Sequence, residues 1–123
     1  MQFAELVRVA REVVAAAQRR LPAEIRPLAA ALPVSYEPLP NDAIVDEGWE
    51  DDILGLFVGH AHGEELRGGD PLPPQILLFL ENIWDYAEGD PATYRDEVRI
   101  TYYHELGHYL GWDEEELARR GLD

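Results

Sequence analysis

Apolar residues recur along the chain at two spacings, one helical and one extended, and these spacings predict the order of its secondary-structure elements. Segment 3–20 has apolar residues at i, i+3, i+4 and i+7, which predicts an amphipathic helix. Its apolar positions are Phe3, Leu6, Val7, Ala10, Val13, Val14 and Ala17. Pro22 and Pro27 follow, and because proline cannot continue a helix, they predict a connection.

Three apolar runs are short enough to be strands. The first, over 34–37, is flanked by prolines, which favour a short or edge strand. The second is DILGLFVG over 52–59, and the third is QILLFLENI over 75–83, with a continuous apolar centre. Between them, segment 60–74 is rich in glycine, proline and charged residues, so we expect a loop.

The place of the third strand in the sheet has a functional consequence. If Ile76–Asn82 is an edge strand beside a catalytic site, an extended peptide can pair with it, and Glu81 and Asn82 then face the cleft. A central strand of the core explains the same apolar run at least as well. Both alternatives are open at this point.

The longest helical pattern lies in the last third of the chain. Asp90 is a good N-cap, and Pro91 suits the first helical position, where its missing N–H has no partner to lose. The pattern continues to Leu110, and Gly111 stands where a C-cap glycine is expected.

A last short helix is predicted after this long one. Asp113 and Glu116 have the three-residue spacing of a capping box, and the helix is expected to end near Arg120. The order is then an N-terminal helix, two or three strands, a long helix and a short C-terminal helix. We therefore expect residues 1–123 to form a single small α+β domain.

Composition narrows the class of protein. Of the 123 residues 46% are hydrophobic, which is enough to bury a core, and no segment resembles a signal peptide or a membrane span. The chain has no cysteine, which excludes disulfides and thiolate metal sites and suits a cytoplasmic protein. Its net charge of −15 disfavours nucleic acid and anionic membranes as partners and favours cationic peptides or metal ions, besides promoting solubility.

Candidate chemistry is concentrated in HELGH, residues 104–108. Positions i and i+4 of a helix project from one face, so His104 and His108 can bind one zinc ion. In this HExxH pattern the glutamate, here Glu105, binds no metal and acts as general base toward the water that zinc activates. The alternative is an amphipathic helix with two partly buried, hydrogen-bonded histidines.

The third zinc ligand must come from the turn after the long helix or from upstream, because only residues 109–123 remain. Asp113 is the natural cap of the final helix. Glu114 occupies the eleventh position of HExxHxxGxxE, where metzincin-like sites place their third ligand. We predict Glu114 as the ligand, with Asp113 as the alternative. A purely structural role for Glu114 is an acid in the first helical turn that interacts with the helix dipole.

The segment RITYYHELGHYLGWDEEEL (99–117) resembles the small bacterial zincin-like metallopeptidases, whose motif is HExxHxxGxxD. Segments 52–59 and 72–83 are similar to strand segments of that family, and the resemblance covers about residues 30–120. It implies a minimal zincin-like fold, in which a short mixed β-sheet packs on a long active-site helix. Family members are single-domain proteins of about this length.

The resemblance also implies roles for individual residues. His104 and His108 match the zinc-ligand histidines, Glu105 matches the catalytic glutamate and Gly111 matches the glycine of the turn. Glu114 stands where the family usually has aspartate. The chain has no methionine after its first residue, so the Met-turn of the metzincins is absent.

The predicted function is that of a zinc-dependent metallopeptidase, with Zn²⁺ as cofactor and a peptide or protein as substrate. The first alternative is a catalytically silent metal-binding or regulatory protein on the same scaffold. A metal-dependent endoribonuclease is disfavoured, because the three-histidine cluster of one such bacterial family is incomplete here and the chain is too acidic for RNA.

Other candidate residues are assigned structural roles. His60 and His62 can chelate a metal weakly, but their loop setting favours solvent exposure. The run DEGWEDD over 46–52 is expected to be an acidic loop anchored by Trp49. Three tyrosines lie near the site, where a phenol can stabilise an oxyanion, although burial in the core is expected for each. They are Tyr102, Tyr103 and Tyr109.

Overall fold

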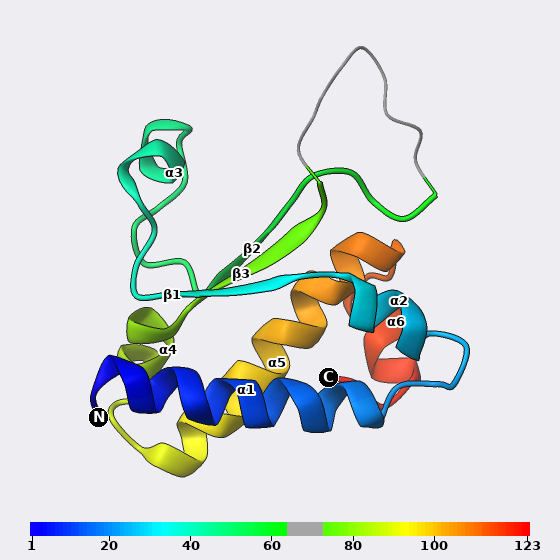
Figure 1. Ribbon diagram of the computed structural model, residues 1–123, viewed down its shortest axis with the longest axis horizontal. Helices are drawn as coiled ribbons and strands as arrows, with labels where there is room; N and C mark the ends of the chain where they lie inside the picture. The colour runs from blue at the N-terminus through cyan, green and yellow to red at the C-terminus, as the bar shows by residue number, and fades with distance from the viewer. Residues whose placement is uncertain (64–72) are drawn as a thin grey trace.

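The periodic segments become helices and strands in the predicted order. The computed structural model describes residues 1–63 and 73–123, and within them the fold is α+β: an N-terminal helix, a three-stranded mixed sheet, a long helix and a short C-terminal helix (Figure 1). The elements are α1 (Phe3–Arg19), α2 (Arg26–Ala31), β1 (Val34–Glu37), α3 (Asp42–Asp46), β2 (Gly55–Val58), β3 (Gln75–Phe79), α4 (Leu80–Tyr86), α5 (Pro91–Leu110) and α6 (Glu114–Arg119). No helix in these residues is long and apolar enough to cross a lipid bilayer.

The sheet has the order β1-β3-β2, with β3 parallel to β1 and antiparallel to β2. The edge position considered for Ile76–Asn82 is therefore wrong, because β3 is the central strand. Its Ile76 and Leu78 point into the core and are fully buried, which explains the continuous apolar run. The two edge strands are β1, as its flanking prolines predicted, and β2.

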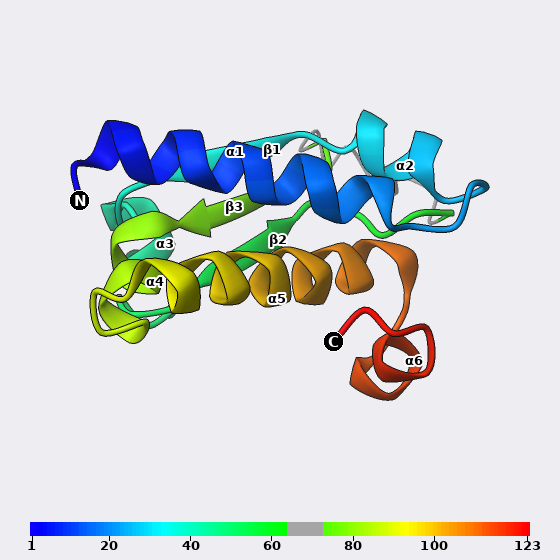
Figure 2. The same ribbon diagram turned by 90° about the horizontal axis from the view of Figure 1, so that it is seen from below.

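Helices α1 and α5 lie side by side on one side of the sheet (Figures 1 and 2). Buried tyrosines of α5 connect the two helices through hydrogen bonds. The hydroxyl of Tyr94 donates to the backbone oxygen of Leu6 at 2.8 Å, and that of Tyr103 donates to Ala17 at 2.7 Å. These bonds satisfy polar groups that burial would otherwise leave unpaired. The expected burial of Tyr103 is confirmed, as is that of Tyr102.

The third predicted strand, over 75–83, is too long. It ends at Phe79, and α4 follows directly, with Leu80, Ile83 and Ala87 buried at helical spacing. The apolar run conceals this change because it fits either period. Asn82 has a structural role: its amide donates to the backbone oxygens of Asp51 at 2.8 Å and Ile53 at 3.0 Å.

Two short helices, α2 and α3, were not predicted from the sequence. Helix α2 begins next to Pro27, which occupies its first turn. Helix α3 is capped by Asn41, whose side-chain oxygen accepts from the backbone N–H of Ile44 at 2.9 Å. The prediction that Trp49 anchors the acidic segment is wrong, because this side chain is exposed. Most of the predicted loop 60–74 lies outside the described residues.

Candidate metal centre

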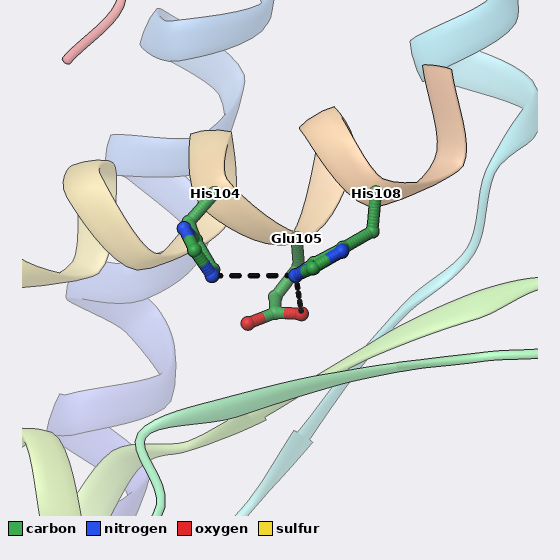
Figure 3. A group of neighbouring side chains, drawn as sticks. All are labelled: His104, Glu105 and His108. Atoms are coloured by element: carbon green, nitrogen blue, oxygen red, sulfur yellow. Dashed lines mark hydrogen bonds and ion pairs between the residues drawn. The ribbon is translucent and has the colours of Figure 1, made fainter. Parts of the chain in front are cut away.

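The two histidines of α5 face each other across one helical turn. The Nε2 atoms of His104 and His108 are 3.3 Å apart, and the two rings are nearly perpendicular, at 87° (Figure 3). The side chains are 44% and 56% exposed, so both rings are open to a ligand from solvent. The i, i+4 spacing predicted this arrangement, because such residues lie on one face of a helix.

This separation fits a zinc ion. Two ligands that each lie about 2.0–2.1 Å from zinc at a tetrahedral angle stand about 3.3–3.4 Å from each other. The observed 3.3 Å between the Nε2 atoms is that distance. Burial and the neighbouring His104 both lower the pKa of His108, which favours the neutral imidazole that a metal requires. The donor set therefore suits zinc.

Glu105 completes a compact group of potential ligands. Its carboxylate lies 3.8 Å from Nε2 of His108, and the donor atoms of His104, Glu105 and His108 are all within 4.8 Å of one another. Figure 3 shows the three side chains on the side of α5 that the strands pass. Among the residues that the structure describes, this is the group that could hold a metal ion.

The environment of Glu105 changes its acidity. The residue is buried, and burial raises the pKa of its carboxyl group; His104 and a hydrogen bond from the backbone of Phe57 act in the opposite direction. Phe57 belongs to β2, so the edge strand of the sheet lies directly against this carboxylate. A buried carboxylate beside an open histidine pair is well placed to exchange a proton there.

Gly55 makes this close approach of β2 and α5 possible. A Cβ atom at this position would lie 2.7 Å from Thr101 Cγ2 and 3.2 Å from Glu105 Cγ. Any side chain would therefore push the strand away from the helix. Gly55 was not among the residues predicted to shape the site, although a glycine inside a predicted strand often marks a close backbone approach.

A second close approach brings the chain back toward His104 after α5 ends. Gly111 has φ of 75°, the left-handed conformation of a C-cap glycine, as expected. The backbone N–H of Trp112 then donates to Gly107 at 2.8 Å. A Cβ atom on Gly107 would lie 2.9 Å from the carbonyl oxygen of Trp112, so a side chain here would disturb the turn.

The two acids of this turn have different surroundings. Asp113 caps α6 as predicted, because its Oδ1 accepts from the backbone N–H of Glu116 at 2.8 Å. Glu114 Oε1 lies 3.8 Å from Nδ1 of His104, the ring nitrogen that does not face His108, and the Glu114 side chain is 86% exposed. Glu114 is thus beside the histidine pair, and in this conformation it lies outside the three-residue group.

The other histidines occupy a different part of the structure. The backbone N–H of His62 donates to Tyr109 at 2.7 Å, and its ring lies 5.6 Å from the Tyr109 ring. His60 is partly buried, and within residues 1–63 and 73–123 its Nδ1 has no hydrogen-bond partner. Neither residue belongs to the group of the described chain that could hold a metal ion.

Comparison with known families agrees with the fold and with this group of residues. The family model described as zincin-like metallopeptidase matches residues 29–122, which extend from α2 to beyond α6 and include the histidine pair. No curated protein matches the chain.

Proposed function

Because the chain belongs to the zincin-like metallopeptidase family, we propose that it is a zinc-dependent peptidase in which Glu105 is the catalytic group. The observation that carries the proposal is the 3.3 Å separation of the His104 and His108 Nε2 atoms, with the buried carboxylate 3.8 Å from His108. Zinc held by these imidazoles would polarise the scissile carbonyl and lower the pKa of water toward about 7.

Glu105 would move the protons of the reaction. Its carboxylate accepts a proton from the attacking water and later delivers it to the leaving amine, so the same group serves as base and then as acid. Burial raises its pKa, and a general base is most effective when its pKa lies near the working pH. Gly55 supports this role, because it lets β2 approach α5 closely enough for the backbone of Phe57 to hydrogen-bond to the Glu105 carboxylate.

We also propose Glu114 as the third zinc ligand. A catalytic zinc has three protein ligands, and Asp113 is already committed to its backbone partner in the cap of α6. To reach a zinc ion held by the two histidines, the exposed Glu114 side chain would rotate from the Nδ1 side of the His104 ring to its Nε2 side. Nothing else in the described chain pairs with this carboxylate at hydrogen-bond or ion-pair distance.

The substrate would bind as an extended strand along β2. The order of the sheet leaves β2 at an edge, and this strand runs beside the catalytic group. Main-chain hydrogen bonds to an edge strand give affinity for peptides of varied sequence. The edge strand β2, and not the central strand β3, would therefore hold the peptide.

A test separates catalysis from metal binding. Zinc per chain and hydrolysis of a mixed peptide library are measured for the wild type, for Glu105→Gln and for Glu5→Gln as a matched control. We expect one zinc in each protein, and a rate that falls by about 10²–10⁴-fold in Glu105→Gln alone, the usual contribution of a general base. Equal rates in Glu105→Gln and the wild type would contradict the mechanism.

The same measurements address the second candidate, a metal-binding or regulatory protein without turnover. The observation that favours it is the openness of the site, where both histidines are about half exposed and water is poorly excluded. Stoichiometric zinc with no cleavage of any peptide by the wild type would support this candidate over the peptidase.

A further inference from the structure

A pocket opens directly beside the metal centre, on the side of Glu114. Its volume is about 390 Å³, and it is lined by apolar side chains from α5, α6 and the segment after α6: Ile100, Leu117 and Leu122. His104 and Glu114 also line it, so a substrate at the proposed zinc site would have this pocket within reach.

Ile100 is an unusual member of this lining. It stands one helical turn before His104 on α5, and it is 39% exposed. Leu117 and Leu122 are buried and form the floor. An exposed large apolar residue next to a candidate catalytic group suits a surface that is covered when substrate binds.

Acidic side chains surround this apolar floor. Glu114 and Glu115 of α6 line the pocket, and so does Asp123. The Glu115 carboxylate is 83% exposed, and its ion pair with Arg119 is long, at 3.8 Å. Arg119 makes its closer ion pair with Glu116.

Two arginines near the pocket, Arg99 and Arg119, do not cancel the acidic character of its lining. Arg99 is the second arginine near the pocket, and it donates to the backbone oxygen of Asp123 at 3.4 Å. Neither arginine is among the residues that line the pocket. A cationic group at the mouth would therefore meet the carboxylates that line the pocket, and it would share Glu115 with the more distant Arg119.

We propose that this pocket binds a lysine or arginine side chain of the peptide substrate, close to the scissile bond. The inference rests on the proposed peptidase function and names its substrate class. The methylene groups of a basic side chain can cover Ile100 and the two leucines, while the cation reaches Glu115 at the rim. An aliphatic side chain uses the floor but leaves the acids without a partner, and an acidic side chain is repelled.

Matched peptides test this preference. Three peptides are compared that carry lysine, norleucine or glutamate at each position within two residues of the scissile bond, because norleucine keeps the stem of lysine without its charge. For zinc-loaded protein we expect the lysine peptide to have a kcat/KM about two- to fivefold above that of norleucine, the range of an exposed ion pair. Glutamate is expected to be the poorest substrate. The lysine advantage should shrink in high salt, which screens exposed charges.

Two variants locate the preference in this pocket. Glu115→Gln should bring the lysine-to-norleucine ratio close to one. Glu5→Gln removes the same charge from the first turn of α1, at the opposite end of the molecule from α6 (Figure 2), and should leave the ratio as in the wild type. An unchanged ratio in Glu115→Gln would overturn the assignment of the cation to this rim.

Failure of the inference can be distinguished from failure of the proposed function. If the peptides are cleaved and norleucine is as good as lysine, the peptidase function stands and the proposed binding of a basic side chain in this pocket is wrong. If no peptide is cleaved, binding of the same labelled peptides to zinc-loaded Glu105→Gln protein is measured by fluorescence anisotropy. Tighter binding of the lysine peptide then supports the pocket, and equal binding refutes it.

Discussion

The polar groups on the two faces of α5 differ in burial and in hydrogen bonding. On the face toward α1, the hydroxyls of Tyr94 and Tyr103 are buried and donate to backbone oxygens of that helix at 2.8 and 2.7 Å. On the other face, the Nε2 atoms of His104 and His108 lie 3.3 Å apart and open to solvent. One helix therefore carries a face whose hydrogen bonds are complete and a face that still has capacity for a ligand.

This contrast shows how a single helix can both anchor the fold and present a candidate metal site. The tyrosine face fixes α5 against α1, and a rigid helix keeps the two imidazoles at a separation that suits zinc. Glu105 is the link between the faces, because it is buried like a tyrosine but its carboxylate lies 3.8 Å from His108. Changes on the histidine face should alter metal binding and catalysis, and changes on the tyrosine face should alter stability.

The largest effect is expected at Gly55, because both properties depend on it. The new Cβ atom in Gly55→Ala would lie 2.7 Å from Thr101 Cγ2 and 3.2 Å from Glu105 Cγ. Overpacking of this kind costs about 1–3 kcal/mol of unfolding free energy. The displaced strand should also lower hydrolysis, as measured by urea unfolding and by peptide assays on one preparation.

A double variant identifies the cause. Thr101→Ser removes Cγ2 but keeps the hydroxyl, so adding it to Gly55→Ala should restore part of the lost stability. The two changes should be non-additive, as expected for residues in contact. Additive losses would mean that the contact with Thr101 is not the source of the effect.

The two neighbouring acids of the turn are expected to have different roles, one in stability and the other in metal binding. Asp113→Ala removes the cap of α6 and should cost about 0.5–2 kcal/mol of unfolding free energy, with zinc retained. Glu114→Ala should change the stability of the metal-free protein little and weaken zinc binding, because among the described residues His104 is the one that pairs with its exposed carboxylate. Zinc per chain and thermal unfolding are measured for both. Loss of zinc in Asp113→Ala, with zinc retained in Glu114→Ala, would mean that Asp113 and not Glu114 is the third ligand.

The parts of the fold that were predicted correctly are those with strong local signals. Helix α5 has the expected bounds because its ends are marked by Asp90, Pro91 and Gly111, residues with specific cap conformations. The boundary between β3 and α4 was missed, because apolar residues occupy consecutive positions there and match either period. Tertiary contacts decide such a segment, and a single sequence does not contain them in readable form.

The site divides in the same way. The group formed by His104, Glu105 and His108 follows from helical spacing alone, since one turn brings the residues together. Gly55 was not predictable as part of the site, because its role depends on contact with a helix far along the chain. The position of Glu114 beside Nδ1 of His104 depends on side-chain rotation of an exposed residue, which no spacing rule describes.

The smallest effect is expected on the tyrosine face. Tyr103→Phe removes the hydroxyl that donates to Ala17 and should cost about 0.5–1.5 kcal/mol of unfolding free energy, while zinc binding and hydrolysis stay as in the wild type. Tyr86→Phe is the matched control. Tyr86 is 64% exposed, so removal of its hydroxyl should change stability little.

The pH dependence of stability gives an independent reading of the same hydroxyl. Burial is the main cause that raises the pKa of Tyr103 above its usual value of 10.0, so the folded protein holds this proton more tightly than the unfolded chain. Stability should then fall as the pH rises from about 10, where the unfolded chain begins to release the proton. The fall should be shallower in Tyr103→Phe and unchanged in Tyr86→Phe when chemical unfolding is compared between pH values of about 8 and 11. Equal slopes in all three proteins would show that the Tyr103 hydroxyl is not held at the interface between α1 and α5. The stabilising role assigned to the tyrosine face of α5 would then be wrong.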